Sequence, residues 1–170
     1  MYKTIYADPP WLERGGGVIK RGADKHYPLM KTADIISLPI IEEVASDNCH
    51  LYLWTTNNFL PDALTVMQAW GFKYKTMITW VKDRQGLGQY FRGMTEHCLF
   101  GAKGNLPYKI IENKRQQGLT VIHAPKTEHS KKPEEMRMMI ERVSYGPFIE
   151  LFARTKTTGR DTWGNPTGGN

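Results

Sequence analysis

The sequence predicts an α/β fold with a mixed sheet and helices on both of its faces. Short apolar strands alternate along the chain with segments in which apolar residues recur at helical spacing, a pattern typical of a sheet covered by helices. Two expected strands, around Trp80 and Phe100, follow one another without a helix between them, so part of the sheet is predicted to be antiparallel. At 170 residues the chain has the length of one ordinary domain, and we expect a single domain over residues 1–170.

The chain begins with an expected strand and an expected loop. Residues 4–7 are apolar and β-favouring, and this strand is predicted to end at Asp8 because Pro9 and Pro10 cannot continue a ladder of hydrogen bonds. The three glycines at 15–17 then predict a mobile loop, since glycine loses the most entropy on ordering.

Helices and strands alternate through the rest of the chain. Residues 32–46 predict two short turns or helices, because Pro39 interrupts their helical pattern. Apolar residues at i, i+3, i+4 and i+7 predict two longer helices, one beginning at Leu60 and stopping before Gly71, the other beginning at Pro133. Further strands are expected at residues 49–55, 72–82, 95–102, 119–122 and 148–152, followed by a polar tail.

The composition excludes several classes of protein. With 40% hydrophobic and 24% charged residues, the chain is too apolar to be disordered. No apolar run approaches the roughly 18 residues of a membrane span, and the N-terminus does not resemble a signal peptide, so we expect no membrane association and a cytoplasmic location. Cys49 and Cys98 stand outside paired motifs, and the five histidines lack metal-ligand spacing, so neither a disulfide framework nor a metal site is expected.

The basic residues are unevenly distributed. Lys and Arg number 23 against 17 Asp and Glu, a net charge of +6. Residues 12–31 have a net charge of +3 and residues 101–132 a net charge of +5, and both segments are predicted to be loops. Basic loops commonly contact phosphates, which makes nucleic acid a candidate partner, although a basic balance is also compatible with an ordinary solvated surface.

The most informative motif is Asp8-Pro9-Pro10-Trp11. It directly follows a strand, where open α/β sheets bind their ligands. A carboxylate, rigidly directed proline carbonyls and an indole together suit an aromatic ring with an exocyclic amine: Asp8 and the Pro9 carbonyl would accept its hydrogens and Trp11 would stack on the ring. Two such acceptors would draw the amine nitrogen toward a nucleophilic, tetrahedral shape. The alternative is structural, with the prolines ending the strand, Asp8 forming a turn and Trp11 packing in the core.

Seven ordered segments resemble a known family. They are ADPPW at 7–11, LWTTN at 53–57, WGF at 70–72 with WVK at 80–82, EHCLFGAKG at 96–104, HSKKP at 129–133, IELFAR at 149–154 and WGN at 163–165. In these segments the chain resembles the adenine-N6 methyltransferases with a DPPW signature, the MT-A70 family. The resemblance implies a Rossmann-like, S-adenosylmethionine-dependent methyltransferase fold of the permuted type, in which the catalytic motif precedes the cofactor motif.

The resemblance also implies roles for individual residues. The catalytic residues would be Asp8, Pro9, Pro10 and Trp11. Cofactor binding would fall to Asp8, Lys132, Arg154, Thr157 and Asn165, with Lys132 on the cofactor carboxylate and Arg154 and Asn165 at the ribose end. Substrate binding would fall to Tyr27, Glu96, Lys25 and Arg14; Tyr27 would cap the target base from a lid at residues 12–30, and Glu96 would either bind the target or close a structural hydrogen bond.

The resemblance implies nucleic acid as partner, and it favours DNA over RNA because the chain is compact like the bacterial and phage members. The stretch 84–93 aligns with a region through which mRNA-type members pair, so a homo- or heterodimer is possible. Two alternatives remain open: a catalytically silent nucleic-acid-binding subunit, which the intact Asp8–Trp11 motif opposes, and a small-molecule N-methyltransferase, which the basic loops oppose.

Overall fold

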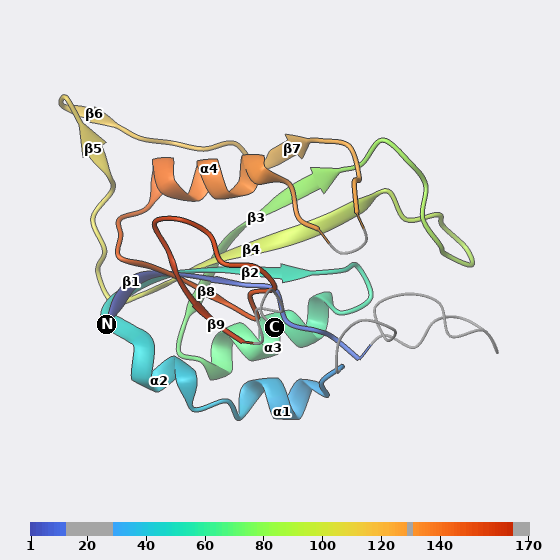
Figure 1. Cartoon of the computed structure of the whole chain (residues 1–170), viewed down its shortest axis with the longest axis horizontal. Helices are drawn as coiled ribbons and strands as arrows, with labels where there is room; N and C mark the ends of the chain where they lie inside the picture. Colours follow the sequence, from blue (N-terminus) through green and yellow to red (C-terminus); the bar gives the residue numbers. More distant parts are fainter. Residues whose placement is uncertain (13–28, 129–130, 165–170) are drawn as a thin grey trace.

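The computed structural model describes residues 1–12, 29–128 and 131–164, and within them a seven-stranded sheet forms the centre of the molecule (Figure 1). The strand order is β7-β3-β4-β2-β1-β8-β9. The strands of this sheet are β1 (Tyr2–Ala7), β2 (Ala45–Thr55), β3 (Lys73–Val81), β4 (Thr95–Lys103), β7 (Val121–His123), β8 (Phe148–Leu151) and β9 (Asp161–Trp163). A separate two-stranded ribbon consists of β5 (Ile110–Ile111) and β6 (Lys114–Arg115).

Within the described sheet, β4 alone runs antiparallel to its neighbours, β2 and β3. The other pairings, β1 with β2 and β8, β3 with β7, and β8 with β9, are parallel. The carboxyl ends of six strands and the amino end of β4 therefore lie along the same edge of the sheet, which we call the carboxyl edge. This confirms the predicted mixed sheet.

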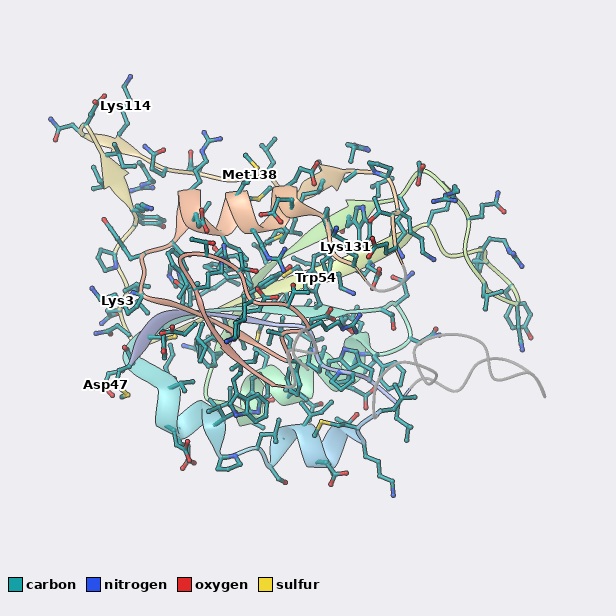
Figure 2. All side chains as sticks on the ribbon, in the orientation of Figure 1. Lys3, Asp47, Trp54, Lys114, Lys131 and Met138 are labelled. Atoms are coloured by element: carbon teal, nitrogen blue, oxygen red, sulfur yellow. The ribbon has the colours of Figure 1, made fainter. Side chains whose placement is uncertain are left out.

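Helices cover both faces of the sheet (Figure 1). One face packs against α1 (Thr32–Ile36), α2 (Ile40–Val44) and α3 (Leu60–Ala69), and the other against α4 (Glu134–Val143). Figure 2 shows the side chains that fill the space between the sheet and these helices. Alternate residues of β1 point to opposite faces: Ile5 belongs to the core under α1–α3, and Tyr6 to the core under α4. None of these helices is long and apolar enough to cross a membrane.

The helix predictions are confirmed except at residues 45–46, which were expected to be helical but begin β2. Three further predictions, of one strand, of the tail and of one loop, are wrong in detail. The strand expected at 119–122 begins only at Val121, and the supposed polar tail contains β9, which pairs with β8. The segment 101–132, predicted to be loop, contains the end of β4, the β5–β6 ribbon and β7. β9 is short and polar, and its strand conformation depends on pairing with β8. β5 and β6 have only two residues each and pair with one another across residues 112–113, so they are too short to show an apolar pattern.

Candidate active site at the carboxyl edge

Asp8 lies at the carboxyl edge directly after β1, and backbone hydrogen bonds fix the turn that follows it. The Asp8 N–H faces the Leu151 carbonyl of β8 at 3.5 Å. The Trp11 N–H donates to the Pro9 carbonyl at 2.9 Å, and the Met30 N–H donates to the Pro10 carbonyl at 2.8 Å. Each carbonyl oxygen has a second lone pair, so Pro9 keeps the capacity to accept another hydrogen bond.

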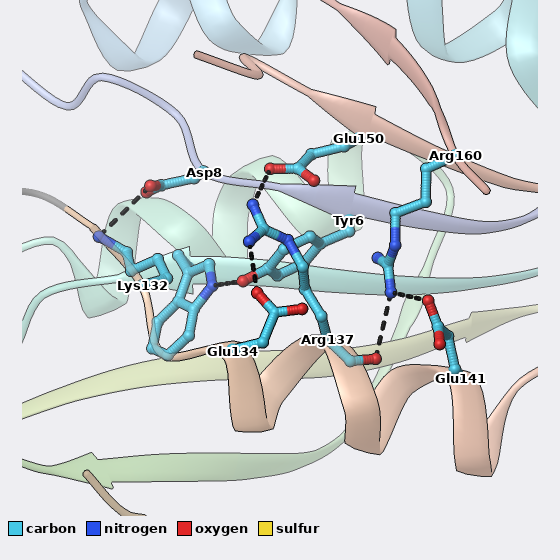
Figure 3. Close-up of polar contacts among 9 residues, drawn as sticks. Tyr6, Asp8, Lys132, Glu134, Arg137, Glu141, Glu150 and Arg160 are labelled. Carbon is cyan, nitrogen blue, oxygen red and sulfur yellow. Dashed lines mark hydrogen bonds and ion pairs between the residues drawn. The ribbon is translucent and has the colours of Figure 1, made fainter. Parts of the chain in front are cut away.

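Four charged side chains of alternating sign form a chain of ion pairs beside this turn. Lys132 Nζ lies 3.3 Å from Asp8 Oδ2 and 3.2 Å from Glu96 Oε1, and Lys82 Nζ lies 2.8 Å from Glu96 Oε2. We call Asp8, Lys132, Glu96 and Lys82 the charge chain. Its members come from four places on the carboxyl edge: the ends of β1 and β3, the start of β4, and the segment before α4. Figure 3 shows Asp8 and Lys132 facing one another at the end of β1.

The ammonium groups of Lys132 and Lys82 each lie over the ring of a buried tryptophan. Lys132 Nζ lies 5.4 Å from the ring centroid of Trp54, and Lys82 Nζ lies 4.8 Å from that of Trp80. The two rings meet edge to face, with centroids 6.1 Å apart. Trp54 Nε1 donates to the Tyr6 hydroxyl at 2.6 Å, so its orientation is fixed. Cation–π attraction stabilises both ammonium groups over this apolar floor.

Burial and neighbouring charges set the ionisation of the charge chain. Burial raises the pKa of the Asp8 carboxyl, and the nearby Lys132 and Arg154 cations offset only part of that rise. Burial acts the same way on Glu96, but there the ammonium groups of Lys132 and Lys82 outweigh it and the pKa lies below its usual value. The pKa of Lys132 is raised, because Asp8 and Glu96 together outweigh the effect of burial. Asp8 is therefore the carboxyl of the site that protonates first.

A cavity of about 70 Å³ opens at this point of the carboxyl edge. It brings together Asp8, Lys132 and Glu96 with Arg154, which follows β8. Its lining residues are Asp8, Pro9, Pro10, Trp11, Trp54, Thr55, Thr56, Glu96, Lys132 and Arg154.

The remaining predicted site residues are not brought into this cavity by the described part of the chain. Thr157 lies in the β8–β9 connection and is not among the lining residues. Arg14, Lys25, Tyr27 and Asn165 lie outside the described residues, as does the segment 13–28 that was expected to form most of the lid.

The indole of Trp11 is buried and does not present an accessible face for stacking on a ligand ring. Its side chain is only 6% exposed, its ring stacks on Phe59 with centroids 5.6 Å apart, and its Nε1 donates to the Trp54 carbonyl at 3.0 Å. The structural alternative considered for Trp11 therefore describes its contacts, although the residue still lines the cavity.

Sequence reasoning gave no role to Lys82, Thr55 or Thr56. All three stand at the end of a strand on the carboxyl edge, Lys82 after β3 and the threonines at the end of β2. The rule that identified Asp8, a polar residue at the carboxyl end of a strand, would have found them. For Glu96, both carboxylate oxygens contact lysines, which favours the structural one of its two expected roles.

The donor set of the cavity suits a zwitterionic ligand. A carboxylate, Asp8, lies within reach of the cations Lys132 and Arg154, so an ammonium and a carboxylate of one ligand could each meet the opposite charge. The amino-acid end of S-adenosylmethionine has these two groups. Among residues 1–12, 29–128 and 131–164, no three His, Cys, Asp or Glu side chains are grouped as a metal ion would require.

Comparison with known proteins identifies a family match over nearly the whole chain. The MT-A70 family model matches residues 2–166. Type II methyltransferase M.MunI of a Mycoplasma species is 33% identical over 184 residues, which cover 96% of this chain and 76% of that protein. The human N(6)-adenosine-methyltransferase catalytic subunit METTL3 is 30% identical over 167 residues, covering 90% of this chain and 26% of METTL3. The MT-A70-like protein of Arabidopsis thaliana is 32% identical over 165 residues, covering 90% of this chain and 22% of that protein.

Proposed function

The chain belongs to the MT-A70 family, and from that premise we propose that it transfers the methyl group of S-adenosylmethionine to the N6 amine of adenine in nucleic acid. One observation carries the proposal: Asp8 lines the cavity together with Pro9 and Pro10, and its carboxylate contacts Lys132. This arrangement offers hydrogen-bond acceptors to an amine and opposite charges to an amino acid in the same place.

The cofactor, when bound, supplies an electrophilic methyl group on a sulfonium. Lys132 would hold the carboxylate of its amino-acid end, and Asp8 would accept from its ammonium group. Arg154, which follows β8 and lines the same cavity, would bind the ribose end, and Thr157 and Asn165 remain further candidates for cofactor binding. Lys132 lies between two carboxylates before any ligand arrives, so its ammonium is already desolvated and oriented.

Asp8 and the Pro9 carbonyl act on the target amine. Both accept hydrogen bonds from its two hydrogens, which draws the nitrogen lone pair out of conjugation with the ring. As the nitrogen forms its bond to the methyl carbon, the carbon–sulfur bond breaks and a neutral thioether leaves. The nitrogen must then release one proton, and the Asp8 carboxylate, which already accepts its hydrogen bond, would take it up. Burial favours this role, because it raises the pKa of the Asp8 carboxyl above its usual value.

The target adenine must leave the base stack to reach this cavity. Its N6 amine is paired in a duplex, so the base is flipped out or is presented in a single strand. DNA is the favoured substrate, because the chain is 33% identical over 96% of its length to the Mycoplasma Type II methyltransferase, against 30% over 90% of its length for human METTL3. RNA remains the alternative substrate. Three expectations from the sequence remain predictions: a single domain over residues 1–170, a cytoplasmic location, and a homo- or heterodimer.

Methyl transfer to a panel of oligonucleotides tests the proposal. Radiolabelled S-adenosylmethionine is offered with double-stranded DNA, single-stranded DNA, single-stranded RNA and a DNA without adenine, and cofactor binding is measured in parallel by calorimetry. We expect label in the adenine-containing DNA and none in the adenine-free control. Cofactor binding with label in free adenosine alone would identify a small-molecule enzyme instead. Oligonucleotide binding without cofactor binding would identify a silent binding subunit.

A further inference from the structure

The connection between β3 and β4 presents two aromatic side chains to solvent. This β3–β4 loop, residues 83–94, projects beyond the carboxyl edge (Figure 1). Tyr90 is 94% exposed and Phe91 is 90% exposed, and Leu87 on the same loop is 66% exposed. Two adjacent aromatic rings that are almost fully exposed cost hydrophobic free energy in the free protein, so they indicate a surface that another molecule covers.

The residues that flank the β3–β4 loop on either side are members of the charge chain. Lys82 immediately precedes the loop and Glu96 follows it closely, and these two side chains form the 2.8 Å ion pair. Through Glu96 and Lys132 the same chain of contacts leads to Asp8. The ends of the loop are therefore connected through the charge chain to Glu96, Lys132 and Asp8, which line the cavity.

Further contacts give the loop a defined shape. The Arg84 guanidinium donates to the Lys126 carbonyl at 2.6 Å, and the Lys126 N–H donates to Asp83 Oδ1 at 2.9 Å. Nearer the tip, the Gly93 N–H donates to the Leu87 carbonyl at 3.1 Å. Gly88 is required at the tip, because a Cβ there would stand 1.9 Å from the Phe91 carbonyl oxygen. The chain thus presents Tyr90 and Phe91 on a closed turn.

We propose that Tyr90 and Phe91 stack on bases of the nucleic-acid substrate that flank the target adenine. This inference rests on the function proposed above. Tyr90 is six residues from Glu96, so the tip reaches at most about 20 Å from the carboxyl edge. Nucleotides of one strand are spaced about 3.4 Å apart, which places the contact within about six steps of the target.

The surroundings of the two rings favour nucleic acid over a second subunit. A stable protein interface buries about 800 Å² on each partner around an apolar centre. Here the sequence neighbours of the rings are the polar Gln89 and Arg92, and the other exposed large apolar residues of the loop are Leu87 and, at its far end, Met94. Aromatic rings with adjacent cations suit bases and phosphates, and a base that leaves the stack exposes the faces of its neighbours to such rings.

Oligonucleotide binding by the double variant Tyr90→Ala/Phe91→Ala tests the inference without requiring turnover. Fluorescence anisotropy measures the Kd for single- and double-stranded DNA, and 2-aminopurine placed one to six steps from the target adenine reports stacking. We expect Kd to rise at least about 10-fold, within the range for lost base stacking, and the 2-aminopurine response to disappear. The Kd for S-adenosylmethionine and the thermal midpoint should stay at wild-type values.

Two comparison variants separate stacking from general hydrophobic contact. Tyr90→Leu/Phe91→Leu keeps apolar side chains but lacks ring faces, so it should resemble the alanine variant, whereas Tyr90→Phe/Phe91→Tyr should bind like the wild type. Tyr74→Ala removes an exposed tyrosine of β3 outside the loop and serves as the matched control.

The outcomes distinguish this inference from the proposed function. If the wild type methylates DNA and the alanine variant binds and methylates it equally well, the inference is wrong and the function stands. If the variant binds DNA normally but changes from dimer to monomer in sedimentation, the rings belong to a subunit interface. If the wild type binds DNA through the rings but methylates nothing, the surface is confirmed and the function is wrong.

Discussion

At the scale of single residues, Lys132 controls the charge state of the site. Its ammonium lies between Asp8 and Glu96, and both carboxylates contribute to its raised pKa. In return, its positive charge is the largest of the influences that lower the pKa of Asp8. Asp8 must be ionised to take up the proton of the target amine, and the carboxylate is a stronger hydrogen-bond acceptor than the protonated carboxyl, so Lys132 extends the pH range in which the site can function.

Replacing Lys132 should therefore change the pH dependence of methyl transfer. In Lys132→Gln the pKa of Asp8 rises further, and protonated Asp8 loses acceptor capacity as the pH falls. We expect the acid limb of the kcat profile to move to higher pH, measured at saturating S-adenosylmethionine, together with a higher KM for the cofactor. Lys131→Gln, at the exposed neighbouring position, is the control and should keep the wild-type profile. An acid limb at the same pH in both variants would show that Lys132 does not act on Asp8.

At the scale of elements, the docking of α4 on the sheet depends on buried charges (Figure 3). Arg137 of α4 reaches Glu150 of β8 at 3.1 Å and Glu134 at 2.9 Å. Arg160, from the loop between β8 and β9, contacts Glu141 at 2.8 Å and donates to the Arg137 carbonyl at 3.1 Å. These contacts hold α4 and the β8–β9 connection together, next to the segments that supply Lys132 and Arg154.

Breaking the pair between Arg137 and Glu150 should be costly in stability. Arg137→Met leaves the Glu150 carboxylate buried, and its second oxygen already lacks a hydrogen-bond partner within the described structure. Removing one partner of a buried pair typically costs about 3–5 kcal/mol in the free energy of unfolding. The double variant Arg137→Met/Glu150→Met should recover most of this loss, as judged by urea unfolding. Equal stability of the single and double variants would contradict the assignment of a buried pair.

A buried histidine in β2 makes the stability dependent on pH. Burial lowers the pKa of His50 to about 4, and its Nδ1 lies 2.8 Å from Ser144 Oγ at the end of α4. The unfolded chain takes up a proton near pH 6.5 and the folded chain only near pH 4, so acid favours unfolding across this window. Down to pH 4, this difference amounts to about 3 kcal/mol.

His50→Asn tests this coupling, because the amide retains a polar partner for Ser144 but does not titrate. Its thermal midpoint should fall less between pH 6.5 and 4 than that of the wild type, even if it is lower at pH 7. Parallel pH profiles for the two proteins would mean that His50 does not carry the acid sensitivity.

Local patterns predicted those elements that carry their own signal. The helix at Leu60–Ala69 has apolar spacing and Pro61 in its first turn, and β1 has an apolar run closed by prolines. β9 has no such signal, since its strand conformation arises from pairing with β8. The site residues differ in the same way, because some carry a local sequence signal and others do not. Asp8 was found from its position after a strand, whereas the role of Lys82 arises from a contact with Glu96 that only the folded sheet creates.

At the scale of the whole molecule, the net charge of +6 predicts a strong salt dependence of nucleic-acid binding. The logarithm of the association constant should fall with the logarithm of the salt concentration, by about 0.9 for each phosphate contact in duplex DNA. Lys126→Ala, beside the root of the β3–β4 loop, should reduce this slope by about one. Lys75→Ala, at an exposed site within β3, should leave it unchanged. An affinity that does not vary between low and moderate salt would contradict the electrostatic contribution.

The most direct test of the proposed chemistry is a single-turnover methyl transfer in which the product nucleosides are identified by mass spectrometry. Wild type, Asp8→Asn and the exposed-site control Asp47→Asn are compared on adenine-containing DNA at saturating S-adenosylmethionine. We expect N6-methyladenine from the wild type and from Asp47→Asn, and a rate at least about 100-fold lower from Asp8→Asn, because the amide is a weaker acceptor and no base. A methyl group on any other atom, or an undiminished rate in Asp8→Asn, would show that the cavity at the end of β1 is not the centre of adenine N6 methylation.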